Sequence, residues 1–235
     1  MESKHLLDII RNPTADAAMR FIEATRAPGQ PEFGIPRNDL AAIQMPEPLR
    51  RFYEFAGRWP GLYRQNRLLA PDELRHDGDK LVFYEENQVV FEWATDLEGE
   101  DPPVWFREPG ADPNYGRWHA ERAPLSAFLL QSLLLEFTFG LGATAGTSSG
   151  WSIPSEIVAR IVDPLEPVPF GPLGGQYDSS TSWLFASDDL IVRVEMTGFA
   201  AEWWVTVAAT CREAFEYLRP IIADGGEGLG IWIDD

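Results

Sequence analysis

The sequence predicts an α+β protein in which a mixed or mainly antiparallel sheet packs against helices. Segments with strand-like alternation and segments with helical periodicity are grouped along the chain, whereas a doubly wound fold would alternate them. The chain has 235 residues, of which 45% are hydrophobic, and it includes nine Trp and fourteen Phe. This amount of apolar material fills a sizeable core in one large domain or two small ones, and we expect a single domain over residues 1–235 that folds alone.

Two helices are expected before the first strand. The first helix begins with a cap at Thr14 and runs to about Arg26, where a stretch rich in proline and glycine ends regular structure. The second helix begins near Pro48, because proline suits a first helical turn, and it ends at Gly57, which suits a C-terminal cap. Apolar residues recur at helical spacing between these two bounds.

A hairpin and a buried helix follow. Residues 81–95 read LVFYEENQVVFEWAT, which predicts two strands around a polar turn at residues 85–88, with Asn87 in a left-handed conformation. A further strand is expected at residues 104–107. Residues 125–139 are apolar around the whole helical circumference, which predicts a helix buried against the sheet.

The last third of the chain resumes regular structure after a loop-rich stretch over residues 141–180. One short apolar segment, residues 157–162, interrupts that stretch. Further strands are expected at residues 183–186, 190–194 and 203–209. The apolar spacing from Cys211 to Arg219 predicts an amphipathic helix that ends at Pro220.

The net charge is the most unusual property of the composition. Thirty-seven acidic residues against nineteen basic residues give a formal net charge of −18 at pH 7. Proteins bind nucleic acids and anionic membranes through Lys and Arg that neutralise phosphate, so we expect neither of these as a partner. An acidic surface keeps a protein monomeric, and it also speeds encounter with a basic protein partner. Composition alone leaves both explanations open.

The sequence lacks the patterns of secreted and membrane proteins. Met1 to Arg11 mixes charged and apolar residues, unlike a signal peptide, and the apolar stretch at residues 125–141 is interrupted by polar side chains. The single cysteine, Cys211, can form no internal disulfide and cannot anchor a multi-cysteine zinc site. We therefore expect a cytoplasmic location, no metal, no cofactor, and Cys211 in the core.

Two glycine-rich patterns resemble catalytic or nucleotide-binding motifs but lie in the wrong context. Residues 146–150 match the G-x-S-x-G nucleophile motif, yet every histidine lies upstream of them, against the order found in hydrolases. Residues 140–145 match the G-x-G-x-x-A dinucleotide motif, but they follow an expected helix where the motif needs a strand. We therefore expect a flexible loop and a helix C-cap at these two positions.

Two acidic patterns also fail as chemical motifs. The alternating acids from Asp96 to Glu100 lack the glycine and the later glutamate that an EF-hand loop needs. Glu85 and Glu86 are neighbours in the expected turn, where they would point apart into solvent and not act as an acid–base pair. We therefore expect no enzymatic activity, and an enzyme with an unrecognised site stays an alternative.

Short motifs between Pro46 and Gly140 occur in an order that resembles the SUKH superfamily. They are LRRFYEFAG at 49–57, WPG at 59–61, QN at 65–66, LL at 68–69, PDEL at 71–74, LVFYEENQ at 81–88, PVW at 103–105 and the helix at 125–139. Members of this superfamily are largely bacterial immunity proteins that bind and neutralise a co-encoded polymorphic toxin, often a nuclease. Fungal relatives of the Smi/Knr type act in cell-wall regulation.

The resemblance implies a SUKH-like fold and inhibition of a cognate protein toxin by stoichiometric binding. This function agrees with the acidic charge, because a toxin that is a nuclease is basic in order to bind a polyanion. It also agrees with a cytoplasmic location, where such a toxin acts. A regulatory scaffold protein of the same fold, without enzymatic activity, is the alternative.

The expected partner-binding surface is the acidic and aromatic stretch from residue 85 to residue 112. Arg107 is the only basic residue in this stretch, and the aromatic residues suit the role of anchors inside a charged rim. The expected contact residues are Glu85, Glu86, Glu92, Asp96, Glu98, Glu100, Asp101, Trp105, Phe106, Glu108 and Asp112. A merely solvated acidic loop is the alternative interpretation.

Overall fold

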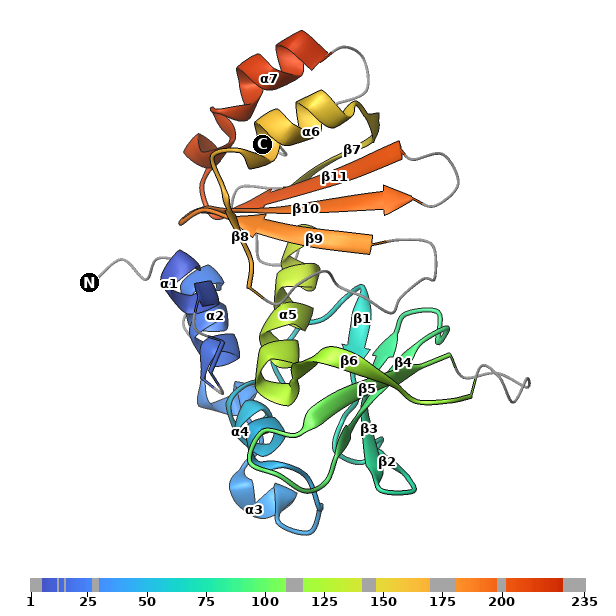
Figure 1. Cartoon of the computed structure of the whole chain (residues 1–235). Coiled ribbons are helices and arrows are strands. Elements are labelled where there is room, and N and C mark those ends of the chain that lie inside the picture. The colour runs from blue at the N-terminus through green and yellow to red at the C-terminus, as the bar shows by residue number, and fades with distance from the viewer. Residues whose placement is uncertain are drawn as a thin grey trace. The chain divides into compact units, whose positions relative to one another are not determined.

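Helices and two antiparallel sheets make up the described part of the chain (Figure 1), which confirms the predicted α+β class. The structure, a computed structural model, describes residues 6–11, 13–14, 16–26, 30–108, 116–140, 147–169, 181–197 and 202–225. Contacts along the chain define two compact units, the first of residues 13–133 and the second of residues 1–12 and 134–235. A single domain over the whole chain stays a prediction.

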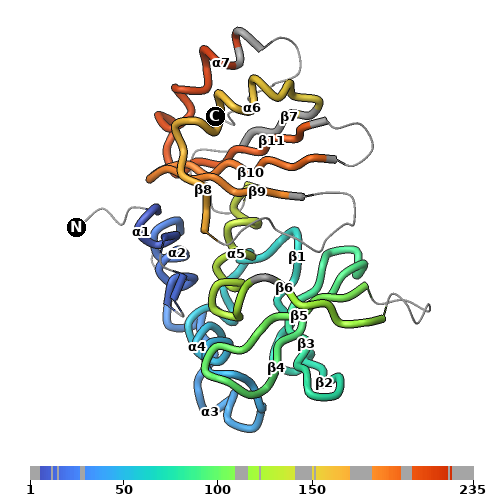
Figure 2. The backbone as a smooth tube through the Cα atoms, in the orientation of Figure 1, coloured from blue at the N-terminus to red at the C-terminus, as the bar shows by residue number. Residues whose placement is uncertain are grey.

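The first unit contains an antiparallel sheet and most of the helices from the N-terminal half. Its helices are α2 (Ala17–Thr25), η1 (Pro31–Phe33), α3 (Arg37–Leu40), α4 (Glu47–Ala56) and the first part of α5 (Leu125–Thr138). Its strands are β1 (Asn66–Leu68), β2 (Arg75–Asp77), β3 (Lys80–Glu86), β4 (Glu92–Asp96), β5 (Pro103–Arg107) and β6 (His119–Pro124). The described strands follow the order β1-β3-β4-β5-β6, and β2 pairs with another part of β3. The course of β3, β4 and β5 can be followed along the backbone in Figure 2.

An aromatic core lies between this sheet and α5. The ring of Phe128 on α5 is surrounded at centroid distances of 5.7, 5.6 and 6.0 Å by the rings of Phe83, Tyr84 and Trp93. A bulge in β3 after Val82 allows two successive aromatic side chains to approach the same helix. The predicted buried helix is therefore confirmed, and it covers one face of the sheet.

Helix α4 matches its prediction closely, and its C-terminal glycine has a packing reason. Gly57 is the C-cap residue, with a φ of −63° that any residue adopts. A Cβ atom at this position would lie 2.6 Å from Ile35 Cδ1 and 2.7 Å from the Tyr53 carbonyl oxygen, closer than real Cβ contacts. Glycine is therefore needed here for close approach and not for a left-handed backbone.

The second unit contains its own antiparallel sheet and core. Its strands are β7 (Thr147–Ile153), β8 (Glu166–Pro167), β9 (Thr181–Ala186), β10 (Leu190–Thr197) and β11 (Glu202–Ala209), in the order β7-β11-β10-β9-β8. Its helices are α1 (Leu6–Arg11), α6 (Ser155–Val162), η2 (Arg212–Phe215) and α7 (Leu218–Gly225). Helices α6 and α7 lie on one face of the sheet (Figure 1) and share an aliphatic core with β10 and β11. An apolar groove of about 280 Å³ between α6 and the sheet is walled by Trp183 and Trp203.

The β3–β4 hairpin differs from its prediction. Strand β3 continues through Glu86, so the turn comprises residues 87–90 and not residues 85–88. The turn residue with positive φ is Val89, at 58°, and not Asn87. Arginine side chains from distant parts of the chain pair with Glu85, near the C-terminal end of β3, and so stabilise it within the sheet. The local sequence does not contain this information.

The predicted start of the first helix and the predicted end of the helix before Pro220 are also wrong. Helix α2 begins at Ala17 with Asp16 as its N-cap residue, and Thr14 contributes a backbone carbonyl instead of a side-chain cap. Pro220 lies in the first turn of α7, where a residue without an N–H group is tolerated, and so it does not end a helix. Cys211 precedes η2 and is only half-buried, so the expectation of a core cysteine is wrong as well.

Candidate protein-binding face

One row of charged residues crosses four neighbouring strands of the first sheet. The register places Arg67 of β1 opposite Glu85 of β3, Glu85 opposite Glu92 of β4, and Glu92 opposite Arg107 of β5. The adjacent aromatic residues of β3 and β4 contact α5, so strand alternation places the row on the other face of the sheet. We call the face that carries this row the polar face.

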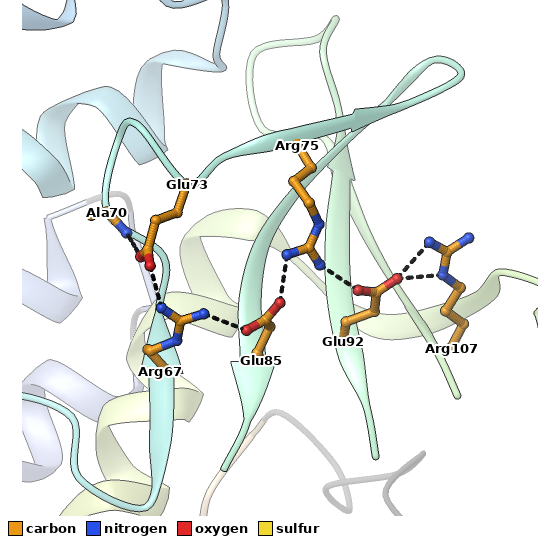
Figure 3. A network of polar contacts seen from close by, with 7 residues as sticks. All are labelled: Arg67, Ala70, Glu73, Arg75, Glu85, Glu92 and Arg107. Carbon is orange, nitrogen blue, oxygen red and sulfur yellow. Dashed lines mark hydrogen bonds and ion pairs between the residues drawn. The ribbon is translucent and has the colours of Figure 1, made fainter. Parts of the chain in front are cut away.

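Arg75 of β2 neutralises the two glutamates of the row. Like charges directly opposite one another in neighbouring strands destabilise a sheet. Arg75 lies between them, and its Nη1 and Nη2 each donate a hydrogen bond of 2.6 Å, to Glu85 and to Glu92 respectively. Arg67 donates to Glu85 at 2.7 Å, and Arg107 donates to Glu92 at 2.5 Å. Figure 3 shows the carboxylates of Glu85 and Glu92, each between two guanidinium groups.

The two carboxylates are buried beneath guanidinium groups that face solvent. The side chains of Glu85 and Glu92 are 5% and 4% exposed, whereas those of Arg67 and Arg75 are 52% and 47% exposed. Burial by itself raises the pKa of Glu85, but hydrogen bonds from the two arginines outweigh it and hold this pKa below its usual value. A carboxylate held in this way is a weak proton acceptor and therefore ill suited to general-base catalysis.

Trp105 is held in place on the polar face by a cation and a carboxylate. The Lys80 Nζ atom lies 4.0 Å from the ring centroid of Trp105, within the range of a cation–π interaction. Asp96 accepts hydrogen bonds from Lys80 Nζ at 2.7 Å and from Trp105 Nε1 at 2.9 Å. The half-buried indole is thus oriented by contacts within the chain.

Trp118 is held in the same way, by a cation over its ring and a carboxylate that accepts from its N–H group. The guanidinium carbon of Arg107 lies 4.1 Å from the ring centroid of Trp118. Asp77 accepts a hydrogen bond from Arg107 and another, of 3.1 Å, from Trp118 Nε1. Tryptophan and arginine are the residues most often found at energetic hot spots of protein interfaces, and here both types are pre-oriented on one face.

Exposed acidic residues gather at one end of the first sheet. Lys80 opens β3 directly opposite Asp96 at the end of β4, so the β2–β3 turn and the β4–β5 loop lie at the same end. Asp79 in the turn is exposed, as are Glu98 and Glu100 in the loop. Within the described ranges, no cation pairs with either glutamate, and Asp79 has only the Lys80 ammonium at 3.7 Å. We call these three residues the acidic end.

Two of the expected contact residues hold other parts of the chain. Glu86 is buried, and its carboxylate accepts hydrogen bonds from two backbone N–H groups of the hairpin turn, at 2.8 and 3.3 Å. Asp101 accepts from the N–H and the hydroxyl of Ser126, at 2.9 and 2.5 Å, and so caps the N-terminus of α5. The expectation that Glu85 and Glu86 are solvated turn residues is wrong, since both are buried in β3.

The remaining expected residues do not form one surface. Trp105 lies on the polar face, whereas its neighbour Phe106 alternates to the α5 side, where its ring lies 5.5 Å from that of His119. Glu108 is half-exposed just after β5. Asp112 lies outside the described residues. Of the expected contact residues, Glu98 and Glu100 are exposed at the acidic end, and Trp105 is half-buried on the polar face.

The basic residues that organise this face lie mostly outside the stretch in which the contact residues were expected. Arg107 was the only cation expected, but Arg67, Arg75 and Lys80 approach the acidic residues from outside the stretch 85–112. Arg67 and Arg75 belong to strands of three residues each, which are too short to show an alternation. The signal that points to them is indirect, since a buried carboxylate requires a cationic or N–H partner.

Comparisons with known proteins identify no relative for this chain. No family model matches the sequence, and no curated protein or solved structure matches it. In the described part of the chain, no helix is both long and apolar enough to span a bilayer. The same residues contain no group of three or more His, Cys, Asp or Glu side chains that could hold a metal ion.

Proposed function

We propose that this chain is a cytoplasmic immunity protein that binds a basic protein toxin and neutralises it by stoichiometric inhibition. The observation that carries the proposal is the acidic end, where Glu98 and Glu100 are exposed, pair with no cation among the described residues, and follow the strand whose Asp96 orients the Trp105 indole. An aromatic anchor next to exposed carboxylates suits a cationic protein surface. The polar face would then lie against the toxin, with the acidic end facing its basic residues.

The charge of the whole chain supports a cationic partner. A net charge of −18 attracts a basic protein from a distance and speeds its association, which matters for an inhibitor that must act before the toxin does. The same charge repels nucleic acids and anionic membranes. A nuclease toxin has a basic surface because it binds a polyanion, so it fits the required partner.

The rigidity of the polar face supports tight binding. Its arginines are already ordered by the carboxylates of Glu85 and Glu92, and its two tryptophans by Asp96 and Asp77. Side chains that are ordered before association lose less conformational entropy when a partner binds. The motif order that resembles the SUKH superfamily adds independent support, because its members are largely inhibitors of co-encoded toxins.

Co-expression with a toxin tests the proposal. The chain is produced in bacteria together with the toxin domain encoded next to its own gene, and survival and co-purification are scored. The proposal predicts survival and a complex of defined stoichiometry. The double variant Glu98→Lys/Glu100→Lys should protect less well, whereas Asp163→Lys/Glu213→Lys, which makes the same charge change at exposed sites of the second unit, should protect like the unmodified chain. Cell death without any complex would count against the immunity function.

A further inference from the structure

The turn of the β3–β4 hairpin exposes two adjacent apolar side chains. Val89 and Val90 are 54% and 41% exposed, and both lie in the turn of residues 87–90, which we call the hairpin tip. Among the described residues, Phe139 and Trp204 are the other large apolar side chains that are exposed. Exposed apolar side chains that adjoin one another indicate a contact site more often than single ones do.

The backbone of the hairpin tip is strained at Val89. Its φ of 58° lies in the left-handed region, which β-branched residues rarely adopt because Cβ approaches the following carbonyl oxygen. Asn87, two residues earlier, is of a type that tolerates this conformation. Two features of Val89 therefore raise the free energy of the free protein. They are its backbone conformation and the exposure of its apolar side chain to water.

Hydrogen bonds that the turn donates to a buried residue impose this conformation. The Glu86 carboxylate accepts from the N–H groups of Gln88 at 2.8 Å and of Val90 at 3.3 Å, and the Glu86 carbonyl accepts from the N–H of Val89 at 2.9 Å. The N–H of Glu86 in turn donates to the carbonyl of Phe91 at 2.9 Å. The valines are thus displayed by a hydrogen-bonded turn whose organising carboxylate is itself buried.

We propose that the hairpin tip is the apolar anchor of the toxin interface and inserts Val89 and Val90 into an apolar pocket of the same basic protein. The proposal rests on the function proposed above. The tip directly continues the two strands that carry Glu85 and Glu92, so it borders the polar face at the end opposite Asp79. The toxin then meets an apolar contact at one end of the polar face and carboxylates at the other.

Two substitutions at Val89 separate backbone strain from apolar contact. Val89→Asn removes the apolar side chain and tolerates a left-handed backbone, so it should raise the melting temperature by about 2–4 °C. Val89→Thr keeps the branched shape and the strain but replaces a methyl group with a hydroxyl, so it should not raise the melting temperature. Both variants should weaken binding of the toxin domain encoded beside the gene about tenfold, as calorimetry would measure.

The control is Trp204→Thr, which removes an exposed apolar side chain from the second unit and should leave the dissociation constant unchanged. Binding of both Val89 variants within twofold of the unmodified chain would overturn the role of the tip and leave the proposed function intact. A lower melting temperature for Val89→Asn would overturn the strain argument. A failure of the unmodified chain to bind would reject the proposed function, and the role of the tip with it.

Discussion

At Arg75 one guanidinium group separates two carboxylates that the sheet register places side by side. Its two terminal nitrogens reach Glu85 and Glu92 at 2.6 Å each, a geometry that the planar fork of arginine allows and the single ammonium of lysine does not. Each carboxylate has a second arginine partner at the end of the row. The polar face thus depends on a residue from a three-residue strand.

Substitution of Arg75 tests this arrangement. Arg75→Met should lower the free energy of unfolding by about 3 kcal/mol, because it leaves two buried like charges opposite each other. Arg67→Met should cost only about 1 kcal/mol, since Glu85 keeps its bond to Arg75. Urea unfolding of the purified variants measures both values. A smaller loss for Arg75→Met than for Arg67→Met would contradict the role given to Arg75.

The pH dependence of stability tests the state of Glu85. Its pKa in the folded protein lies below the ordinary value of 4.5, so the folded state binds fewer protons than the unfolded state as the pH falls. The stabilisation by Glu85 is therefore complete above pH 4.5 and is lost as the pH falls through the folded-state pKa. Urea midpoints between pH 6 and pH 3 should fall more steeply for the unmodified chain than for Glu85→Gln. Parallel curves would show that Glu85 is not held as an anion by the arginines.

At the scale of single residues, the sequence predicted the exposed acids better than the buried ones. Glu98 and Glu100 lie in a short loop where local composition determines exposure. Glu85 and Glu92 look equally acidic in the sequence, but arginines from β1, β2 and β5 make their burial possible. Burial of an ion pair depends on long-range contacts, which a local pattern does not contain.

Among the elements, long periodic segments were predictable and short ones were not. Helices α4 and α5 and strands β9 to β11 lie close to their predicted ranges, because the apolar pattern of each segment, a helical repeat in α4 and a continuous apolar run in α5, extends over several residues. Strands β1 and β2 are three residues long, and β7 lies in a Gly/Ser-rich segment expected to be a loop. In these segments pairing with a neighbouring strand decides the structure, and intrinsic propensity does not.

Helix α5 packs on the first sheet, and the stability of the sheet depends on this packing. Phe128 contacts the rings of three aromatic residues from β3 and β4. Phe128→Ala should therefore lower the free energy of unfolding by about 4 kcal/mol, through lost burial and the cavity left behind. Val90→Ala, at a side chain 41% exposed in the hairpin tip, should cost less than about 1 kcal/mol. Chemical denaturation measures both, and similar losses would contradict the assignment of Phe128 to the core.

At the scale of the whole molecule, the distribution of charge decides where a cationic protein would approach, and the total charge does not. Arg67, Arg75 and Arg107 are committed to carboxylates of the same face, so their charges are largely balanced within the chain. Glu98 and Glu100 at the acidic end have no such partner in the part of the chain that the structure describes. The net charge of −18 therefore reaches solvent through specific exposed carboxylates, and these decide where a cationic protein approaches.

The resemblance to the SUKH superfamily rests on residues 46–140, almost all of which lie in the first unit. The second unit, with its own sheet and aliphatic core, was foreseen only as further strands and a helix after a loop-rich stretch. Glycine, serine and proline dominate the sequence before β9, and they hide the periodicity of α6 and β7. Composition alone therefore did not separate the two units.

The dissociation constant of the toxin complex tests the central claim most directly. It should be measured at low and at high salt for the unmodified chain, for Glu98→Lys/Glu100→Lys and for the control Asp163→Lys/Glu213→Lys. The account predicts that charge reversal at the acidic end weakens binding at least about tenfold at low salt and reduces the dependence on salt, while the control changes neither. Equal affinity and equal salt dependence for all three proteins would contradict binding through the acidic end.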